Sequence, residues 1–406
     1  MKSKSFFVLL AFLLILSASA FSQSKETGAI NGKVLDDQGN PLPGVTLKLT
    51  SPNLMGTRSV ITDANGLFRF PALPPGVYQL KAEMPGFGTV VQDNLRVTTT
   101  VTLSTDLTMT PSTVQEQVTV MAQSPTVDIK STETASVTLS NEILRNMPYS
   151  NFTADIVNMA PGVNNNVAYG ASSDTGISYQ MDGVGVADPD GGSAWVFVDS
   201  NIIEEAKVMG VGLPAEYGNF TGVIFNLVTK SGGNEFSGHM EFLFQGKQTD
   251  KPAGLWGTTN NGSYVEDFPD VTSPISKLYD ANFHLGGPII KDKLWFYAGV
   301  QWYRTWDYPT GFAAYSPTGP GTPVAIDYKQ PRQFAKLTSQ VTPSLSINLS
   351  VEHDDYRGNY RGGSSTVSPE ATVNQTGPET FPALNLTYIL NPKTFFDFKA
   401  AGFSAY

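Results

Sequence analysis

The chain has 406 residues, no cysteine and a formal net charge of −10. Its length predicts several domains. The acidic balance disfavours a nucleic-acid partner, because phosphate binding requires clustered Lys and Arg. The lack of cysteine disfavours a small scaffold held by disulfides, so the stability of the fold has to come from large sheets.

Residues 1–20 have the pattern of a cleaved export signal. A short basic start precedes an unbroken apolar run at 6–16, and Ala18 and Ala20 are small residues suited to a cleavage site. The run is too short for a membrane-spanning helix, which needs about 20 apolar residues. No later run reaches that length, so entry into a membrane would require a closed β-barrel.

Short alternating strands separated by turns fill residues 25–110. Val45, Leu47 and Leu49 alternate with polar residues, and the pattern returns at 101–109. This period of two predicts half-buried antiparallel strands. The segment therefore predicts a β-sandwich of roughly seven strands. Sequences rich in Gly, Pro, Asn and Asp mark the turns at 37–41, 63–66 and 74–76.

The turn sequences of this segment resemble those of the carboxypeptidase regulatory-like domain. The matching strings are residues 32–34, 41–45, 62–66 and 73–78. The resemblance implies a prealbumin-like sandwich among the carbohydrate-binding-like folds, and it does not imply peptidase activity. The first histidine of the chain is His239, so the segment has no histidine for a zinc site.

Residues 123–234 change in composition. Two short helices are predicted, one around 143–147 that stops at Pro148 and one around 152–159 that stops at Pro161. Several strings here resemble the plug domain of TonB-dependent receptors, in the Oar-like branch that has a regulatory-like domain in front. These strings are 159–163, 181–184, 214–218 and 226–234, and the plug motif that they imply contains Asp182, Gly183, Glu216, Tyr217 and Gly218.

The stretch at 111–122 is predicted to be a linker between the two domains. The receptor resemblance implies that part of it acts as a TonB box, a short segment that pairs as an added strand with a periplasmic energy-transducing protein. The alternatives are an ordinary linker and the first strand of the plug. The candidate box contains Glu116, Gln117, Val118, Thr119 and Val120.

Alternating strands return in residues 235–406. In 345–355, apolar residues at odd positions alternate with polar residues at even positions, the apolar-out and polar-in signature of a transmembrane barrel. Seven such strands are predicted, at 238–246, 279–287, 294–304, 332–341, 345–355, 381–390 and 395–404.

The connections of these strands alternate between short and long. Outer-membrane barrels have short periplasmic turns and long external loops, whereas a soluble sandwich has no reason to lengthen every second loop. Aromatic residues at 302–308 suit a girdle at the membrane surface. The short turns are 288–293, 342–344 and 391–394, and the long loops are 247–278, 305–331 and 356–380.

Residues 235–406 are expected to be only the start of a barrel. Single-chain bacterial barrels have an even number of strands. A barrel that holds a plug of this size has about 22 strands, because an eight-stranded interior has room only for side chains. Membrane lipid is then a partner, the location is the outer membrane, and residues 25–110 lie in the periplasm.

No motif supports catalysis, a cofactor or a metal site. His239, His284 and His353 are on different predicted strands, and His284 is expected to face the barrel lumen. The acidic stretch 188–192 could be read as a calcium loop but lacks the further carboxylates that such a loop needs, so a plug loop is favoured. Residues 63–66 are expected to be a tight turn.

The sequence therefore predicts a mainly β protein: a β-sandwich, an α+β plug and the start of an antiparallel transmembrane barrel. The favoured function is a non-enzymatic TonB-dependent receptor or transporter for an external ligand such as a carbohydrate, peptide or metal chelate. The alternatives are an Oar-like surface protein in secretion or adhesion, and a soluble carbohydrate-binding module of the periplasm.

Overall fold

The fold is mainly β, as expected from the sequence. The computed structural model describes residues 26–111, 117–121, 136–146, 156–164, 167–168, 176–187, 198–210, 222–245, 275–307, 324–364 and 366–405. The signal residues Ala18 and Ala20 lie outside these ranges. None of the described helices is long and apolar enough to span a bilayer.

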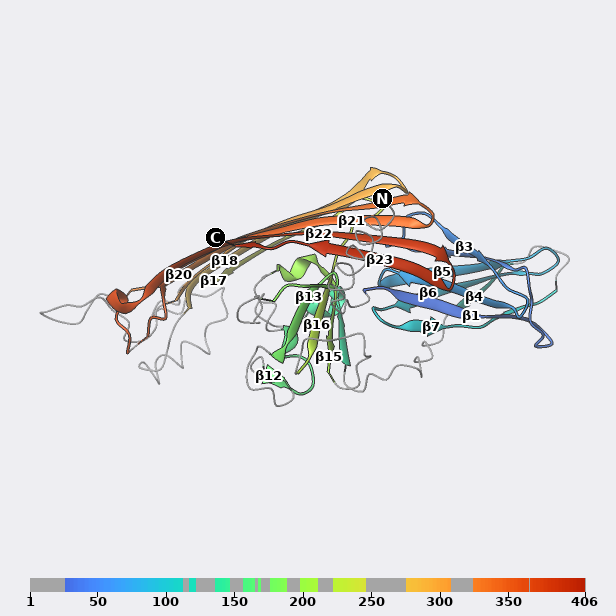
Figure 1. Cartoon of the computed structure of the whole chain (residues 1–406), viewed down its shortest axis with the longest axis horizontal. Helices are drawn as coiled ribbons and strands as arrows, with labels where there is room; N and C mark the ends of the chain where they lie inside the picture. Colours follow the sequence, from blue (N-terminus) through green and yellow to red (C-terminus); the bar gives the residue numbers. More distant parts are fainter. Residues whose placement is uncertain are drawn as a thin grey trace, which may run out of the picture.

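The first domain is a sandwich of two sheets, seen on the right of Figure 1. One sheet contains β4, β1, β7 and β8, and the other has the strand order β3-β2-β5-β6-β9. The strands are β1 Gly28–Asp36, β2 Thr46–Thr50, β3 Arg58–Ile61, β4 Leu67–Leu73, β5 Gly76–Glu83, β6 Thr89–Val97, β7 Thr102–Ser104, β8 Leu107–Met109 and β9 Gln117–Met121.

The alternation in the sequence gives this domain a core of its own. In β2, Leu47 and Leu49 are buried between the sheets while Lys48 is exposed. Phe70 and Tyr78 from neighbouring strands fill the same core. The predicted sandwich is therefore confirmed.

The prediction that the strands pair antiparallel is wrong for the last part of the domain. Both β7 and β8 run parallel to β1, with Ala29 paired with Thr102 and Val34 with Leu107. Between β7 and β8, the backbone at Thr105 approaches β1 closely. A Cβ added at Gly32 would lie only 1.7 Å from the carbonyl oxygen of Thr105, so this position requires glycine. Alternation reports which side chains are buried and carries no information on strand direction.

Within the stretch expected to be a linker or the first plug strand, the described residues 117–121 join the sheet of the first domain. Strand β9 pairs in parallel with β6, from Thr89 opposite Gln117 to Asp93 opposite Met121. The sheet of the first domain thus includes a strand beyond the expected boundary at residue 110. A polar, extended sequence does not reveal which sheet it will join.

The plug lies under the curved sheet, in the centre of Figure 1. Its main sheet has the order β10-β15-β16-β13-β14, and α2 packs on it through the buried Leu144. The elements are β10 Ser136–Ser140, α2 Asn141–Asn146, β11 Val163–Asn164, β12 Val167–Ala168, β13 Ser178–Met181, β14 Val184–Gly185, a 3-10 helix Ser200–Ile202, β15 Ile203–Met209 and β16 Ile224–Thr229.

The two predicted plug helices are described only in part. The first corresponds to α2, which ends at Asn146. Of the second, the structure describes its end, where Ile156 and Val157 are buried and turn hydrogen bonds continue to Ala160. Its first half lies outside the described residues.

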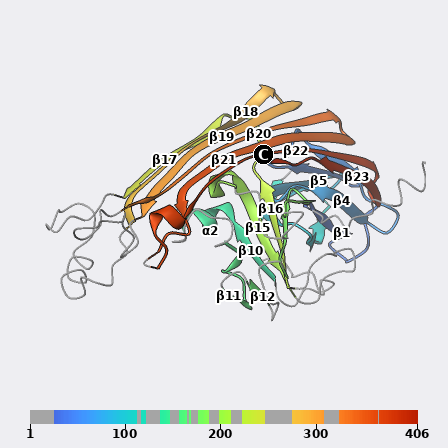
Figure 2. The same ribbon diagram turned by 60° about the vertical axis from the view of Figure 1, so that its left-hand side comes forward.

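A curved antiparallel sheet arches over the plug and beside the sandwich (Figure 2). Its strands pair in sequence order from β17 to β23, and β24 pairs with β22. They are β17 Ser237–Gln245, β18 Ile275–Ile290, β19 Leu294–Asp307, β20 Ile326–Thr342, β21 Leu345–Arg361, β22 Val373–Asn391, β23 Thr394–Ala401 and β24 Ser404–Ala405, with a 3-10 helix at Pro369–Ala371 before β22.

All seven predicted barrel strands are present, but most are longer than expected. Residues 356–361 and 373–380 were expected in a loop, yet they pair as the ends of β21 and β22. The apolar alternation ends where these strands become polar, so it marks only their more apolar part. The last predicted strand is divided at residues 402–403 into β23 and β24, which both pair with β22.

The predicted aromatic girdle at 302–308 is wrong as a single cluster. Trp302 is 61% exposed on the outer face, whereas its neighbour Tyr303 is buried on the inner face. Adjacent residues of a strand point to opposite faces, so consecutive aromatic residues cannot share one belt. Residue 308 lies outside the described ranges.

Candidate functional site: the interface between plug and barrel

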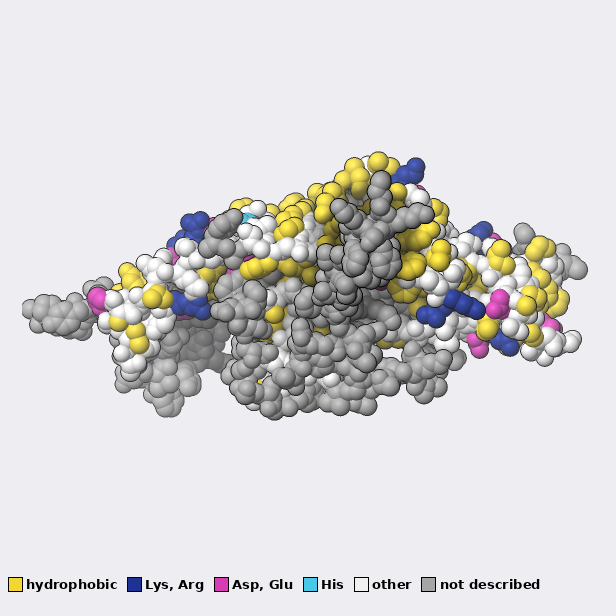
Figure 3. Space-filling view, in the orientation of Figure 1, with side chains coloured by type: hydrophobic (Ala, Val, Ile, Leu, Met, Phe, Trp, Pro, Cys, Tyr) yellow, Lys and Arg dark blue, Asp and Glu magenta, His cyan; other side chains and the backbone are white. Residues whose placement is uncertain are grey.

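The two faces of the curved sheet differ in polarity. Its inner face presents buried polar and charged side chains, among them Asp280, Asn282, His284, Gln301, Arg332, Lys336, Glu352 and Asp354. Its outer face presents large apolar side chains to the surroundings, among them Phe242, Phe283, Trp302, Leu349, Phe396 and Phe398. Apolar side chains gather along the upper, outer face in Figure 3. This arrangement confirms the predicted apolar-out and polar-in strands.

A buried lysine of the sheet holds the plug at its predicted motif. The Nζ of Lys336 on β20 lies 3.0 Å from Oδ2 of Asp182, with which it forms an ion pair, and donates to Oγ1 of Thr229 at 2.8 Å. All three side chains are almost fully buried. We call Lys336, Asp182 and Thr229 the plug latch.

The plug presents Asp182 in a turn that its backbone makes specific. Asp182 and Gly183 have φ angles of 47° and 75°, between β13 and β14. The backbone N–H of Asp182 donates to Leu227 O at 2.8 Å, and its carboxylate accepts from the N–H and Oγ1 of Thr229 at 2.9 and 2.6 Å. The carboxylate is therefore also held from within the plug, by Thr229. Left-handed backbone favours Gly and, among other residues, Asp and Asn.

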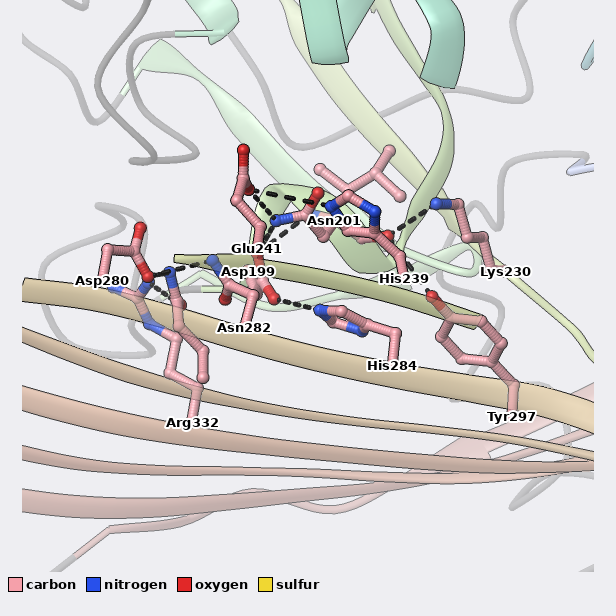
Figure 4. A network of polar contacts seen from close by, with 12 residues as sticks. Asp199, Asn201, Lys230, His239, Glu241, Asp280, Asn282, His284, Tyr297 and Arg332 are labelled. Atoms are coloured by element: carbon pink, nitrogen blue, oxygen red, sulfur yellow. Dashed lines mark hydrogen bonds and ion pairs between the residues drawn. The ribbon is translucent and has the colours of Figure 1, made fainter. Parts of the chain in front are cut away.

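A second contact joins the segment before β15 to the sheet (Figure 4). Asp199 Oδ2 lies 2.8 Å from Nε2 of His284, and both side chains are buried. Asp199 Oδ1 also accepts from the backbone N–H of Asn201 at 2.9 Å, which caps the short helix 200–202. The expected lumen-facing position of His284 is confirmed.

Asn201 gathers three further side chains at this contact, as Figure 4 shows. Its side-chain Nδ2 donates to Glu241 Oε2 at 3.3 Å, and its carbonyl oxygen accepts from Tyr297 Oη at 3.4 Å and Lys230 Nζ at 2.7 Å. Burial lowers the pKa of Lys230 to about 8. Residues from the sheet and from the plug thus meet in one polar network.

The other two histidines also form contacts between side chains. Nδ1 of His239 lies 3.0 Å from the guanidinium of Arg145 in the plug, and its ring stacks at 6.5 Å on that of His284, its partner across the strands. Nδ1 of His353 lies 2.9 Å from Oγ1 of Thr380. Within the described part of the chain, no three His, Cys, Asp or Glu residues are placed to hold a metal ion.

Polar side chains continue along the inner face away from the latch. The guanidinium of Arg332 donates to Gln301 Oε1 at 2.7 Å and to Gln330 Oε1 at 2.6 Å. Gln301 in turn donates to Asp280 Oδ1 at 2.9 Å. Such a surface is suited to water and polar solutes, and it is costly to expose to lipid.

Of the predicted site residues, the structure brings Asp182 and Gly183 into the interface. Glu216, Tyr217 and Gly218 lie outside the described residues, as does the acidic stretch 188–192. Glu116 of the candidate TonB box is also outside, while Gln117, Val118, Thr119 and Val120 are in β9. The expected turn at 63–66 is present, since Asp63 Oδ1 accepts from the N–H groups of Asn65 and Leu67 at 2.9 Å each.

Lys336 and Asp199 are interface residues that were not predicted from the sequence. Lys336 had a signal, because it is a charged residue at an inward position of a predicted membrane strand. Asp199 had none, since its partner His284 is 85 residues away.

Comparisons with known proteins agree with these features. Residues 29–110 match the family model of the carboxypeptidase regulatory-like domain. The chain is 30% identical over 305 residues to the TonB-dependent transporter Oar of Myxococcus xanthus, which covers 72% of this chain and 28% of that protein. The chain thus spans about a quarter of the length of that curated relative.

Solved structures with a similar course of the chain include a siderophore receptor and an outer membrane transporter. The siderophore receptor PirA from Pseudomonas aeruginosa has a TM-score of 0.47 at 17% identity, over 66% of this chain and 40% of PirA. The outer membrane transporter YddB from Escherichia coli has a TM-score of 0.47 at 12% identity, over 63% of this chain and 37% of YddB. The sequence match to Oar, together with the regulatory-like domain, confirms that this chain is related to the Oar-like TonB-dependent receptors.

Proposed function

We propose that the protein containing this chain is an outer-membrane TonB-dependent receptor that binds an external ligand and gates its passage through a plugged β-barrel. Residues 25–110 and β9 lie in the periplasm. The ligand is a carbohydrate, a peptide or a metal chelate, and the proposal includes no catalytic step.

The seating of the plug is the observation that carries this proposal. Buried ionic contacts hold the plug against the polar inner face of the sheet, in addition to an apolar cluster that the two share, while the outer face is apolar. Apolar side chains would give a purely structural interface at least the same stability, because the attraction between buried charges often only offsets the free energy that their burial costs. Ionic contacts of this kind are suited to a plug that has to move away from the inner face of the sheet.

Energy coupling is proposed to act through the candidate TonB box, Glu116 to Val120. A periplasmic partner adds a strand to this segment and pulls on it, and the plug then moves far enough to open a path. Backbone pairing supplies the affinity in such strand addition.

Substitution of the latch lysine tests the gating function. Lys336→Met leaves Asp182 buried without its cation, and breaking one side of a buried ion pair costs about 3–5 kcal/mol. In cells producing the full-length protein, we expect a several-fold rise in sensitivity to vancomycin, which is too large for ordinary porins. The matched control is Lys329→Met, an exposed lysine of the same strand.

An unchanged sensitivity of the Lys336→Met cells, with the protein present in the outer membrane, would contradict a gating role for the plug.

Transport that stops when a protonophore removes the proton-motive force separates an energised importer from a secretion or adhesion protein.

A further inference from the structure

The regulatory-like domain carries the candidate TonB box along one of its own strands. Parallel pairing with β6 extends over all five residues of β9, from Gln117 opposite Thr89 to Met121 opposite Asp93. Strand β6 is in turn paired on its other side with β5. The segment proposed to be pulled is therefore built into the sheet of this domain.

The same strand β6 leads directly into a contact with the plug. Beyond its last residue, Val97, the chain turns at Thr99 and Thr100. The backbone N–H and Oγ1 of Thr99 donate to Oε1 of Glu205 on β15 at 2.9 and 2.6 Å. From the plug, Nζ of Lys207 donates to Thr99 O at 3.3 Å and to Oγ1 of Thr100. We call these four residues the corner.

Burial shows that the corner is an interface and not a chance surface contact. Thr99 is 0% exposed, Glu205 5% and Lys207 2%. Two charged side chains of one plug strand are thus covered by the regulatory-like domain. Buried charges of this kind need their partners, because an unpaired buried charge is strongly destabilising.

Strand β15 is also the plug strand that continues from the contact with the barrel. Asp199 pairs with His284 of the sheet just before β15 begins, and β15 pairs with both β10 and β16. Thr229 of the latch ends β16, opposite Ile203. A displacement of β15 would therefore disturb both contacts between plug and sheet, the Asp199–His284 pair and the plug latch.

We propose that the regulatory-like domain is the handle of the plug: a pull on β9 is carried by β6 to the corner and from there to β15. The inference deepens the proposed function and rests on it, since it needs a partner that pulls on the TonB box. It identifies the corner as the joint through which the domain and the plug move together.

The partner can act without removing β9 from β6. A strand has two edges, and β9 is the last strand of its sheet among the described strands. No described strand pairs with its outer edge, and a strand added there would extend the sheet from five strands to six. Pairing on the inner edge then remains to transmit the pull.

A single cysteine at Val198 reports displacement of the plug. Val198 is buried in the core that plug and barrel share, and the chain has no natural cysteine. In cells producing the full-length protein with Val198→Cys, labelling by a membrane-impermeant maleimide is quantified by mass spectrometry, with and without a protonophore. The readout is the ratio of the energised to the de-energised labelling rate, which we expect to be several-fold above one.

Corner variants are then introduced into this reporter protein. Thr99→Val removes one hydroxyl and keeps the side-chain shape, and Glu205→Gln removes the buried carboxylate. For both we expect the ratio to fall to about one while the de-energised rate stays at its reporter value, because the plug remains seated. Thr98→Val is the matched control, since the hydrogen bonds of the corner to the plug come from Thr99 and Thr100 and none among the described residues comes from the side chain of Thr98.

A disulfide between β6 and β9 tests the path itself. Asp93 and Met121 are register partners outside the candidate box, so Asp93→Cys with Met121→Cys fixes β9 to its neighbour. We expect the ratio to persist after oxidation. A ratio that falls and recovers with a reductant would overturn the inference, because β9 would then have to leave β6.

The failure of the inference differs from the failure of the proposed function. A ratio of one in the reporter protein itself would contradict energised displacement of the plug, and therefore both the proposed function and the inference. A ratio above one that the corner variants leave unchanged would contradict only the proposed role of the regulatory-like domain as a handle.

Discussion

Two short-range carboxylate turns organise the surface of the regulatory-like domain. Asp36 Oδ1 accepts from the N–H groups of Gln38 and Asn40 at 2.9 and 2.7 Å, and Asp63 makes the equivalent bonds in the next turn. The hydrogen bond from the Asn40 side chain is the main cause of the lowered pKa of Asp36, and that from the backbone N–H of Leu67 is the main cause of the lowered pKa of Asp63. Each turn is thus stabilised by the ionised form of its aspartate.

These turns predict an acid-sensitive domain. Because both folded pKa values lie below the ordinary value of 3.8, their contribution to stability is complete above that pH and is lost as the pH falls through the folded values. A fragment of residues 26–121 has its own core and should unfold cooperatively. Its melting temperature should fall below pH 3.8, and less steeply in Asp36→Asn and Asp63→Asn.

Asp37→Asn is the matched control for these variants, since the Asp37 carboxylate accepts no such turn bonds among the described residues. Circular dichroism melts between pH 2 and pH 6 provide the measurement. Equal pH dependence in the wild type and both turn variants would show that these carboxylates do not stabilise the domain.

At the residue scale, the sequence predicts one residue of the plug latch, Asp182. Asp182 and Gly183 were recognised because their motif is local. Their partner Lys336 lies 154 residues further along the chain, and only the register of β20 brings it there. A single sequence contains the inward position of this lysine but not the identity of the residue that it faces.

At the element scale, strand positions followed from alternation, but strand partners did not. The barrel strands pair with their sequence neighbours, so their order could be expected. Strands β7, β8 and β9 instead pair in parallel with strands far back in the sequence. Such pairings depend on tertiary contacts that alternation does not encode.

A proline in β9 tests whether this strand is the coupling element. Val118→Pro removes a backbone donor and disfavours strand pairing on either edge. We expect energised displacement of the plug to be lost, measured as labelling at Val198→Cys, while the protein remains in the outer membrane. Gln123→Pro, placed two residues beyond β9, is the control and should retain the displacement.

Retained displacement in Val118→Pro would mean that β9 is not the coupling element. The corner and the latch would then remain as structural contacts, and the pull would have to act elsewhere on the plug.

At the scale of the whole molecule, the two faces of the curved sheet and the position of the plug fit a location in the outer membrane. The curved sheet has an apolar outer face and a polar inner face, and the plug is seated against the inner face by buried charges. The sequence predicts this order of domains, because each has its own pattern of alternation and turns. It does not predict how the domains dock, since the corner and the network around Asn201 join residues from separate segments.

Ion conductance through planar lipid bilayers tests the plugged barrel most directly. The full-length protein should insert and remain closed, because the plug occupies the polar interior. Deletion of residues 123–234 should produce a stable, large conductance from the same barrel. An intact protein that conducts freely, or a deletion variant that inserts and stays closed, would contradict the account.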